Sequence, residues 1–166
     1  MKKFFKNYLK RNPKVDNSTM LGIYCLVIVI SGVFGWIYEF IFYYFNSGMK
    51  SFYWRGSNFL PWINIYAIGA ILIILLTFKK RRNPLYVFTV SVIATGILEY
   101  IGGWILENLM NVKCWDYTKE ILSFGNINGY VCIRSVLIFG IFSLVLMYIL
   151  LPLCFYIAKK MKKKHV

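Results

Sequence analysis

One segment of the sequence combines a hydrophobic stretch with an acidic side chain. Residues 28–45, IVISGVFGWIYEFIFYYF, are apolar enough to lie in a bilayer, yet Glu39 stands among them. An ionised carboxylate in hydrocarbon is costly unless it meets a proton, a cation or an arginine. We therefore interpret Glu39 as a binding residue that faces away from lipid.

A second acidic stripe occurs further along the chain. Glu99, Gly103 and Glu107 are four residues apart and so share one face of a helix. Gly35 precedes Glu39 by the same interval. Because glycine lets helix backbones approach closely in membranes, we expect the two stripes to face each other inside a bundle.

The composition indicates the elements that must position these residues. Of the 166 residues, 59% are hydrophobic and only 16% are charged, which is unusual for a small soluble domain. Four stretches approach the length of about 20 apolar residues that crosses a bilayer. We predict an all-α polytopic membrane protein, a four-transmembrane-helix bundle forming a single domain over residues 20–157, with spans at about 20–45, 60–78, 85–110 and 131–157.

The two ends of the chain are basic. In residues 1–14, MKKFFKNYLKRNPK, aromatic residues and lysines alternate at helical spacing, which predicts an N-terminal interfacial amphipathic helix. A plain basic topogenic arm is the alternative. The first span lacks a small-residue cleavage site, so we expect it to be retained. Residues 158–166 are predicted to form a basic cytoplasmic tail.

The distribution of basic residues predicts the orientation. Fifteen of the twenty lysines and arginines lie before the first span, in the KKRR run (79–82) or after the last span. The positive-inside rule therefore places both termini and this loop on the cytoplasmic side of the membrane. Because this charge flanks the spans, the neighbours expected are anionic lipid headgroups, and no nucleic acid is expected.

The two outer loops bring more polar and aromatic residues to the same half of the bilayer. Residues 52–66 and 111–135 contain glycines, asparagines and a proline that favour turns, so we expect structured outer loops. All five tryptophans fall in this half, either as an interfacial belt or as the lining of a pocket. Their proximity to acids favours a ligand pocket built from Glu39, Glu99, Glu107, Asp116, Arg55, Arg134, Trp36, Trp54 and Trp115.

Several motifs occur in the order found in a known family. They are G-W-x-x-E, R-G followed by P and Y-x-x-G-A, then E-Y-x-x-G, W-D-Y and N-x-N-G, over roughly residues 20–150. This pattern resembles the small bacterial membrane family labelled "putative ABC-transporter type IV", or CmpB-like, permease. The resemblance implies a multi-span protein of the bacterial plasma (inner) membrane that works with a transport ATPase. Tyr117 and Asn128, which belong to the last two motifs, complete the candidate ligand-binding set.

Other residues limit the chemistry that the chain can perform. There is no G-x-x-x-x-G-K-[ST] phosphate loop, so any ATP hydrolysis must come from a partner. The sole histidine, His165, is on the tail, which argues against histidine catalysis and a metal site in the outer half. No cofactor is expected. Cys114 and Cys132 could form a disulfide or stay reduced.

Three interpretations of the acidic and aromatic residues follow. In the first, the chain is a transport component, a permease or substrate-binding subunit, whose outer pocket captures a small molecule. In the second, it is a membrane enzyme that uses the carboxylates as acid and base on a lipid-linked or peptide substrate. In the third, it is a structural subunit. Four spans are few for a complete path, so we expect a homo- or hetero-oligomer.

Overall fold

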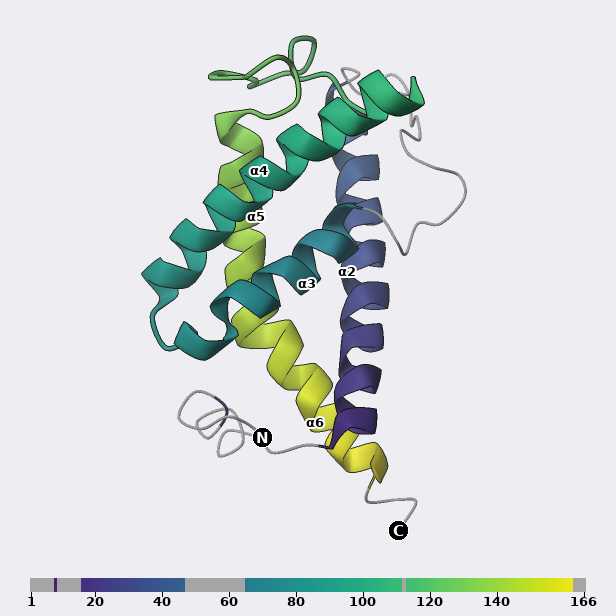
Figure 1. The fold of residues 1–166 in the computed structure, drawn as a ribbon, viewed down its shortest axis with the longest axis vertical. Helices are drawn as coiled ribbons and strands as arrows, with labels where there is room; N and C mark the ends of the chain where they lie inside the picture. The colour runs from purple at the N-terminus through teal and green to yellow at the C-terminus, as the bar shows by residue number, and fades with distance from the viewer. Residues whose placement is uncertain (1–7, 9–15, 47–64, 112, 163–166) are drawn as a thin grey trace.

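The computed structural model describes residues 8, 16–46, 65–111 and 113–162, and the regular elements among these residues are all helices (Figure 1). The predicted all-α class is confirmed: these residues form no β-strand, and their one β-bridge joins Ile127 to Val131. In chain order the elements are α2 (Asn17–Asn46), α3 (Ile65–Thr77), the 3-10 turn η1 (Phe78–Lys80), α4 (Pro84–Met110), α5 (Ile133–Val145), the π-helical turn η2 (Leu146–Leu150) and α6 (Leu151–Lys162).

Three described stretches are long and apolar enough to cross a membrane: Asn17–Phe42, Pro84–Met110 and Ile133–Lys162. They correspond to the first, third and fourth predicted spans. The second prediction, about 60–78, corresponds to α3, which has 13 described residues. At 1.5 Å per residue α3 rises about 20 Å, less than the ~30 Å hydrocarbon core. Residues 60–64, which would begin that span, lie outside the described residues.

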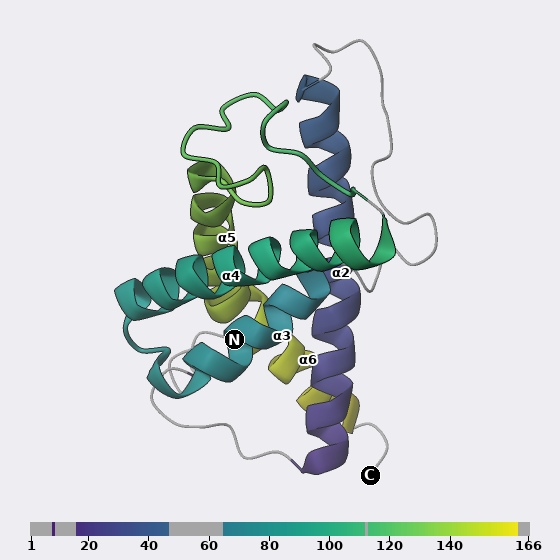
Figure 2. The same ribbon diagram turned by 45° about the horizontal axis from the view of Figure 1, so that its top comes forward.

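α4 packs on α5, and α3 packs on α2. α3 and α4 lie side by side and run at an incline across α2 and α5 (Figures 1 and 2). α6 continues the last span beyond η2 and packs against the first half of α2 (Figure 1). This arrangement brings the second half of α2, the start of α3 and the start of α5 to the same end of the molecule as the loop between α4 and α5.

The last span bends at η2, where Pro152 follows a π-helical turn. In this register the N–H of residue 152 would donate to the carbonyl of Met147, and proline has no N–H to give. The Tyr8 hydroxyl donates to that carbonyl instead, at 3.1 Å. Tyr8 is the only residue of the predicted N-terminal helix, 1–14, that falls within the described residues.

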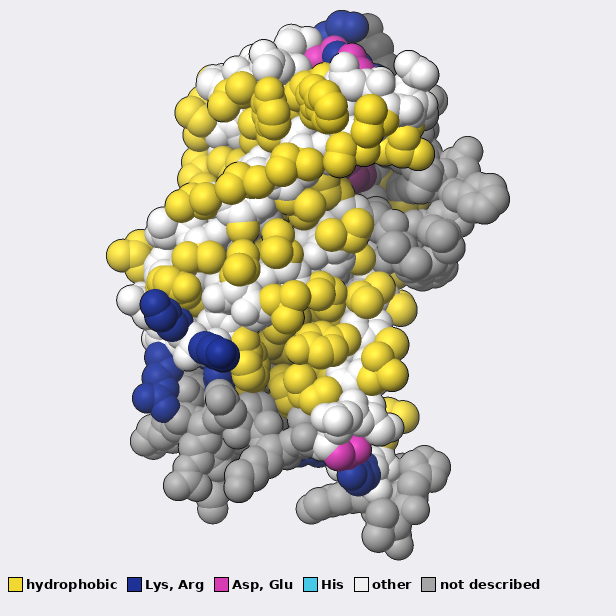
Figure 3. Space-filling model, viewed as in Figure 1, with side chains coloured by type: hydrophobic (Ala, Val, Ile, Leu, Met, Phe, Trp, Pro, Cys, Tyr) yellow, Lys and Arg dark blue, Asp and Glu magenta, His cyan; other side chains and the backbone are white. Residues whose placement is uncertain are grey.

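The outer surface has an apolar middle and charged ends. Figure 3 shows a broad hydrophobic band between two charged ends, with Lys and Arg predominating at the lower end and acidic and basic side chains together at the upper end. In the KKRR run Lys79, Lys80 and Arg82 are exposed, whereas Arg81 is buried and donates two hydrogen bonds to the Tyr8 carbonyl, at 2.6 and 3.1 Å. A hydrophobic band of this kind is what a lipid bilayer requires of the surface it covers.

The inner face of α4 is small and polar. Its buried residues recur every fourth position, Val87, Ser91, Thr95, Glu99 and Gly103. Such a stripe lets neighbouring helices pack closely and keeps the Glu99 carboxyl out of lipid.

Candidate functional site

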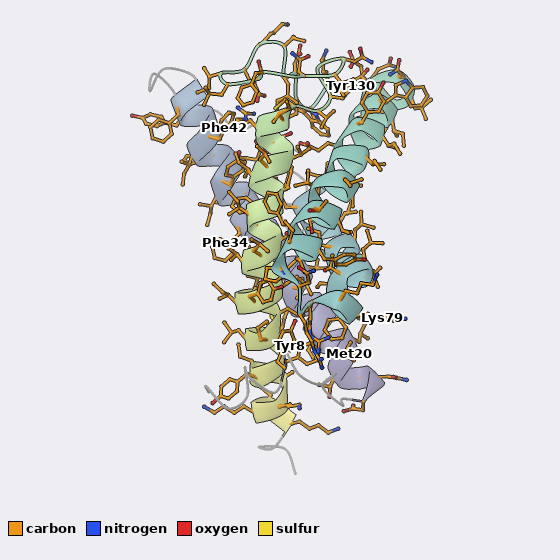
Figure 4. The ribbon with its side chains drawn as sticks, turned by 90° about the vertical axis from the view of Figure 1, so that its left-hand side faces the viewer. Tyr8, Met20, Phe34, Phe42, Lys79 and Tyr130 are labelled. Atoms are coloured by element: carbon orange, nitrogen blue, oxygen red, sulfur yellow. The ribbon has the colours of Figure 1, made fainter. Side chains whose placement is uncertain are left out.

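A cavity of about 30 Å³ lies between α2, α3, α4, α5 and the loop that joins α4 to α5. It is at the end of the molecule where Figure 4 shows Phe42, while Tyr8 and Lys79 lie toward the opposite end. The described residues that line it are mostly acidic, aromatic or hydroxyl-bearing: Tyr38, Glu39, Phe42, Ile65, Tyr66, Glu99, Trp115, Tyr117, Glu120, Arg134, Ser135, Ile138 and Phe139.

Gly35 determines how Glu39 is held. A Cβ at position 35 would lie 2.2 to 2.6 Å from three atoms of the Tyr66 side chain, so only glycine leaves room for that tyrosine. Packed there, Tyr66 donates its hydroxyl to the Glu39 Oε1 atom at 2.6 Å. The G-W-x-x-E and Y-x-x-G-A motifs thus form one contact between α2 and α3: the glycine admits the ring, and the glutamate one turn later accepts its hydroxyl.

Glu99 is the most deeply buried carboxylate of the cavity, with 4% of its surface exposed. Tyr117 donates to its Oε1 atom at 2.6 Å, and Ser135 donates to its Oε2 atom at 2.7 Å. Ser135 also closes the capping box that starts α5 at Cys132. Glu99 therefore ties α4 to both the loop and the first turn of α5 through hydroxyl donors.

Arg134 joins three parts of the site. Its guanidinium pairs with the Glu120 carboxylate at 3.0 Å, donates to the Ile121 carbonyl at 2.7 Å and lies 4.2 Å from the centre of the Phe42 ring. The Glu120 side chain is only 6% exposed and that of Arg134 only 10%. The buried Nε atom of Arg134 has no hydrogen-bond acceptor.

The loop owes its shape to a tight turn at the N-x-N-G motif. Asn128 and Gly129 both have positive φ, 54° and 76°, the combination of a type I′ turn in which Asn-Gly is favoured. The N–H of Ile127 donates to the Val131 carbonyl at 2.9 Å across this turn. The turn brings Tyr130 against α4, where its carbonyl accepts a hydrogen bond from the Trp115 indole at 2.8 Å.

Two titratable groups of this loop are shifted by their surroundings. The Thr118 hydroxyl, which donates to Asp116, holds the pKa of that carboxyl below its usual 3.8. Burial, followed by the neighbouring Glu99 carboxylate, raises the pKa of Tyr117 well above 10. Tyr117 therefore stays protonated near neutral pH and remains a hydrogen-bond donor to Glu99.

The structure brings five of the predicted ligand-binding residues together at the cavity: Glu39, Glu99, Trp115, Tyr117 and Arg134. Four others lie elsewhere. Glu107 and Asp116 each lie 3.3 Å from the Lys113 ammonium, Asn128 donates to the Tyr100 hydroxyl, and Trp36 stacks on Phe40 with 38% of its surface exposed. The predicted residues Arg55 and Trp54 lie outside the described residues.

Sequence reasoning missed several residues that line the cavity, chiefly Tyr38, Tyr66, Glu120 and Ser135. Tyr66 belongs to the Y-x-x-G-A motif. That its ring fits into the space left by Gly35 on another helix cannot be seen from the spacing of residues in the sequence. Glu120 carries the negative charge that would balance the positive charge of Arg134. No sequence signal distinguishes Ser135 from any other serine at a helix start.

The chemistry available at the cavity is that of carboxylates and hydroxyls. Among the described residues, no group of three or more His, Cys, Asp or Glu side chains is arranged to hold a metal ion. Cys132 is buried with a free thiol, so the alternative Cys114–Cys132 disulfide is not formed in this structure.

The family model described as "Putative ABC-transporter type IV" matches residues 26–166. The chain belongs to this family. The resemblance predicted from the motifs is thereby confirmed, and the match spans every described residue of the cavity. Membership of a transporter family together with three apolar helices of spanning length identifies a membrane protein. No curated protein and no solved structure matches the chain.

Proposed function

We propose that this chain is the membrane component of an ABC-type transporter and that the cavity is its ligand-binding pocket, in the outer half of the bilayer. The observation that carries the proposal is the meeting of Glu39 from α2 and Glu99 from α4 at one cavity. Carboxylates are seldom buried at membrane depth without a functional reason. Hydroxyl donors orient the Glu99 carboxyl, and an oriented carboxylate suits recognition of a positively charged ligand.

The side of the membrane on which the pocket lies is inferred from the distribution of charged residues. The exposed Lys79, Lys80 and Arg82 lie at the end of α3 and the start of α4, remote from the cavity, and α6 ends in further lysines. The positive-inside rule assigns that end to the cytoplasm and the cavity to the opposite half. On this proposal α3 belongs to the second of four spans, the one predicted at about 60–78.

The transporter role requires a second chain. The sequence contains no phosphate-binding loop, so ATP hydrolysis would come from an ATPase docked at the basic cytoplasmic end. A bundle of this size encloses little space, which favours an oligomer or a heteromeric complex as the working unit.

A single comparison tests the proposal. The tagged chain is purified in mild detergent from its own cells, and the ATPase activity of the co-purified complex is measured in nanodiscs with and without a cationic solute mixture. Glu39→Gln and Glu99→Gln should abolish solute stimulation while the ATPase remains bound.

The matched control is Asp16→Asn, which changes an exposed acid at the other end of the molecule. It should be stimulated like the unmodified chain. An isolated chain without an ATPase, or equal stimulation in all variants, would contradict the proposed role.

A further inference from the structure

We propose that the tip of the loop between α4 and α5 lies in the bilayer interface, with its apolar side chains among the phospholipid headgroups and the first carbons of the acyl chains. The loop tip comprises residues 121–127, ILSFGNI. Four features carry the inference: the exposed apolar side chains, the absence of charge, the backbone at Leu122 and continuity with a lipid-facing stripe of α5.

The loop tip exposes large apolar side chains. Between 46% and 67% of the surface of each of four residues is exposed: Ile121, Leu122, Phe124 and Ile127. A loop that faces water ordinarily exposes polar side chains, and apolar side chains that gather at a surface mark contact with a membrane or another protein. The loop tip is therefore suited to a partner other than water.

The sequence around the loop tip carries no charge. No Asp, Glu, Lys or Arg occurs in residues 121–133. The next residue, Arg134, directs its guanidinium to the Glu120 carboxylate, and its side chain is only 10% exposed. Because moving a charge out of water is costly, a segment without charges can enter the interface with little penalty.

The backbone at Leu122 indicates that this side chain has a use outside the fold. Its φ is 55°, in the left-handed region where a Cβ atom is crowded. The other described residues with positive φ are of the two types that adopt this conformation most easily: Asn111, Gly125, Asn128 and Gly129. At a turn that faces water, Gly or Asn would avoid the strain. Contact between the exposed leucine side chain and lipid would offset it.

The loop tip continues an apolar stripe of the last span. Four residues of α5 at intervals of four are exposed and apolar: Ile133, Leu137, Ile141 and Val145. Gly125 lies against the first of them, since an added Cβ at position 125 would be 2.5 Å from the Ile133 side chain. The Ile133 N–H also donates to the Phe124 carbonyl at 3.4 Å. The surface that lipid covers on α5 thus extends onto the loop tip, which lies beside the start of that helix (Figure 2).

The chemistry of the loop limits the insertion to a shallow depth. Irregular backbone does not face lipid within the hydrocarbon core, because its N–H and C=O groups would lack hydrogen-bond partners. Asn126 and Asn128 are also exposed beside the apolar side chains. The boundary between headgroups and acyl chains meets both conditions, since it solvates the polar groups while the apolar side chains reach the upper acyl chains.

The loop tip is attached to the wall of the cavity. Arg134 donates to the Ile121 carbonyl at 2.7 Å and pairs with Glu120 at 3.0 Å, and Arg134 and Glu120 both line the cavity. A bilayer that holds the loop tip therefore also restrains this part of the wall.

Quenchers carried by lipid test the position of the loop tip. Leu122→Cys, Phe124→Cys and Lys119→Cys are made in a variant lacking the native cysteines, labelled with the environment-sensitive fluorophore NBD and placed in phosphatidylcholine nanodiscs. Doxyl groups near the headgroup should quench positions 122 and 124 severalfold more than position 119, and aqueous iodide should show the reverse order. Lys119 is the matched control, because it lies on the same loop and its charged side chain is 81% exposed.

Two results would overturn the inference. One is equal quenching of the three positions by the doxyl lipid. The other is protection of positions 122 and 124 from iodide without quenching by the doxyl lipid, because protein would then cover the loop tip. Neither measurement needs an ATPase or a transported ligand, so the outcome is independent of the proposed transport role.

A second measurement keeps the native cysteines, in case their removal prevents folding. Photoreactive benzoylphenylalanine replaces Leu122 in the otherwise unmodified chain, which is irradiated in the same nanodiscs and analysed by mass spectrometry. An adduct with the mass of a phospholipid is the expected product. An adduct with a second copy of the chain, or no adduct, would contradict lipid contact at the loop tip.

Discussion

At the scale of single residues, the site depends on hydroxyl groups that hold carboxylates. Tyr66 serves Glu39, and Tyr117 and Ser135 serve Glu99, each at 2.6 or 2.7 Å. Hydrogen bonds to charged or buried acids are among the stronger ones in proteins. The two carboxyls are consequently fixed in direction, which a binding site needs and a purely lipid-facing position would not.

Removing the Tyr117 hydroxyl tests this arrangement. Tyr117→Phe keeps the ring and leaves Glu99 with one donor, so we expect the free energy of unfolding to fall by about 1–3 kcal/mol. Thermal or denaturant unfolding in nanodiscs measures the change. Tyr24→Phe is the control, because Tyr24 packs against the hydrophobic core and no hydrogen bond of its hydroxyl is found among the described residues. Equal effects of the two variants would contradict a specific role for Tyr117.

Asp116 gives the loop a pH dependence. The Thr118 hydroxyl lowers the pKa of Asp116 below 3.8, so the ionised form stabilises the fold fully above that value and the contribution is lost as pH falls through the lowered pKa. Asp116→Asn should therefore lower the melting temperature at about pH 7, and the difference should shrink toward about pH 3. A difference that does not vary with pH would show that charge is not involved.

At the scale of elements, the contact between α2 and α3 depends on an absent side chain. Gly35 is buried under Tyr66, and the atoms that an added Cβ would meet are the first atoms of that side chain, which cannot swing away. At the opposite end, Tyr8 satisfies the carbonyl that Pro152 leaves open at the bend before α6. The packing of these helices therefore depends on two local features: the missing side chain at Gly35 and the missing backbone N–H at Pro152.

Gly35→Ala should force α2 and α3 apart. We expect destabilisation of about 1–3 kcal/mol, the range for overpacked cores, and weaker solute binding because Glu39 loses its alignment. Gly22→Ala is the matched control on the same helix, since nothing lies within 4 Å of its added Cβ. Adding Tyr66→Ala to Gly35→Ala should cost less than the sum of the two single changes. Full additivity would contradict the proposed clash.

At the scale of the whole molecule, charge and hydrophobicity determine how the bundle sits in the bilayer. A hydrophobic band separates the exposed basic turn between α3 and α4 from the loop that covers the cavity. The orientation proposed from these charges makes the cavity an outer site.

Cysteine labelling in intact cells tests this orientation. In a variant lacking the native cysteines, Asn126→Cys, on the exposed loop, should react with an impermeant maleimide, and Arg82→Cys should react only after lysis. Position 82 is preferable to 81, since Arg81 is buried. Labelling of position 82 in intact cells would invert the orientation and place the cavity on the cytoplasmic side.

The helical class, three of the spans and the family could all be predicted from the sequence. Each depends on local information: runs of apolar residues long enough for a bilayer, and short motifs around Gly35, Glu39 and Glu99. The prediction that the acidic stripes face away from lipid followed from the free-energy cost of a charge in hydrocarbon alone. The four-span count depended on α3, whose described length falls short of a full crossing.

The membership of the cavity was decided by tertiary structure alone. Glu99 and Glu107 belong to one helical stripe, yet the bundle buries the first and leaves the second paired with Lys113, because the loop covers only part of α4. Trp36 and Trp115 are the same residue type, but one stacks on its own helix and the other lines the cavity. Spacing along a helix specifies a face, whereas the crossing of neighbouring helices and the path of a loop specify what that face meets.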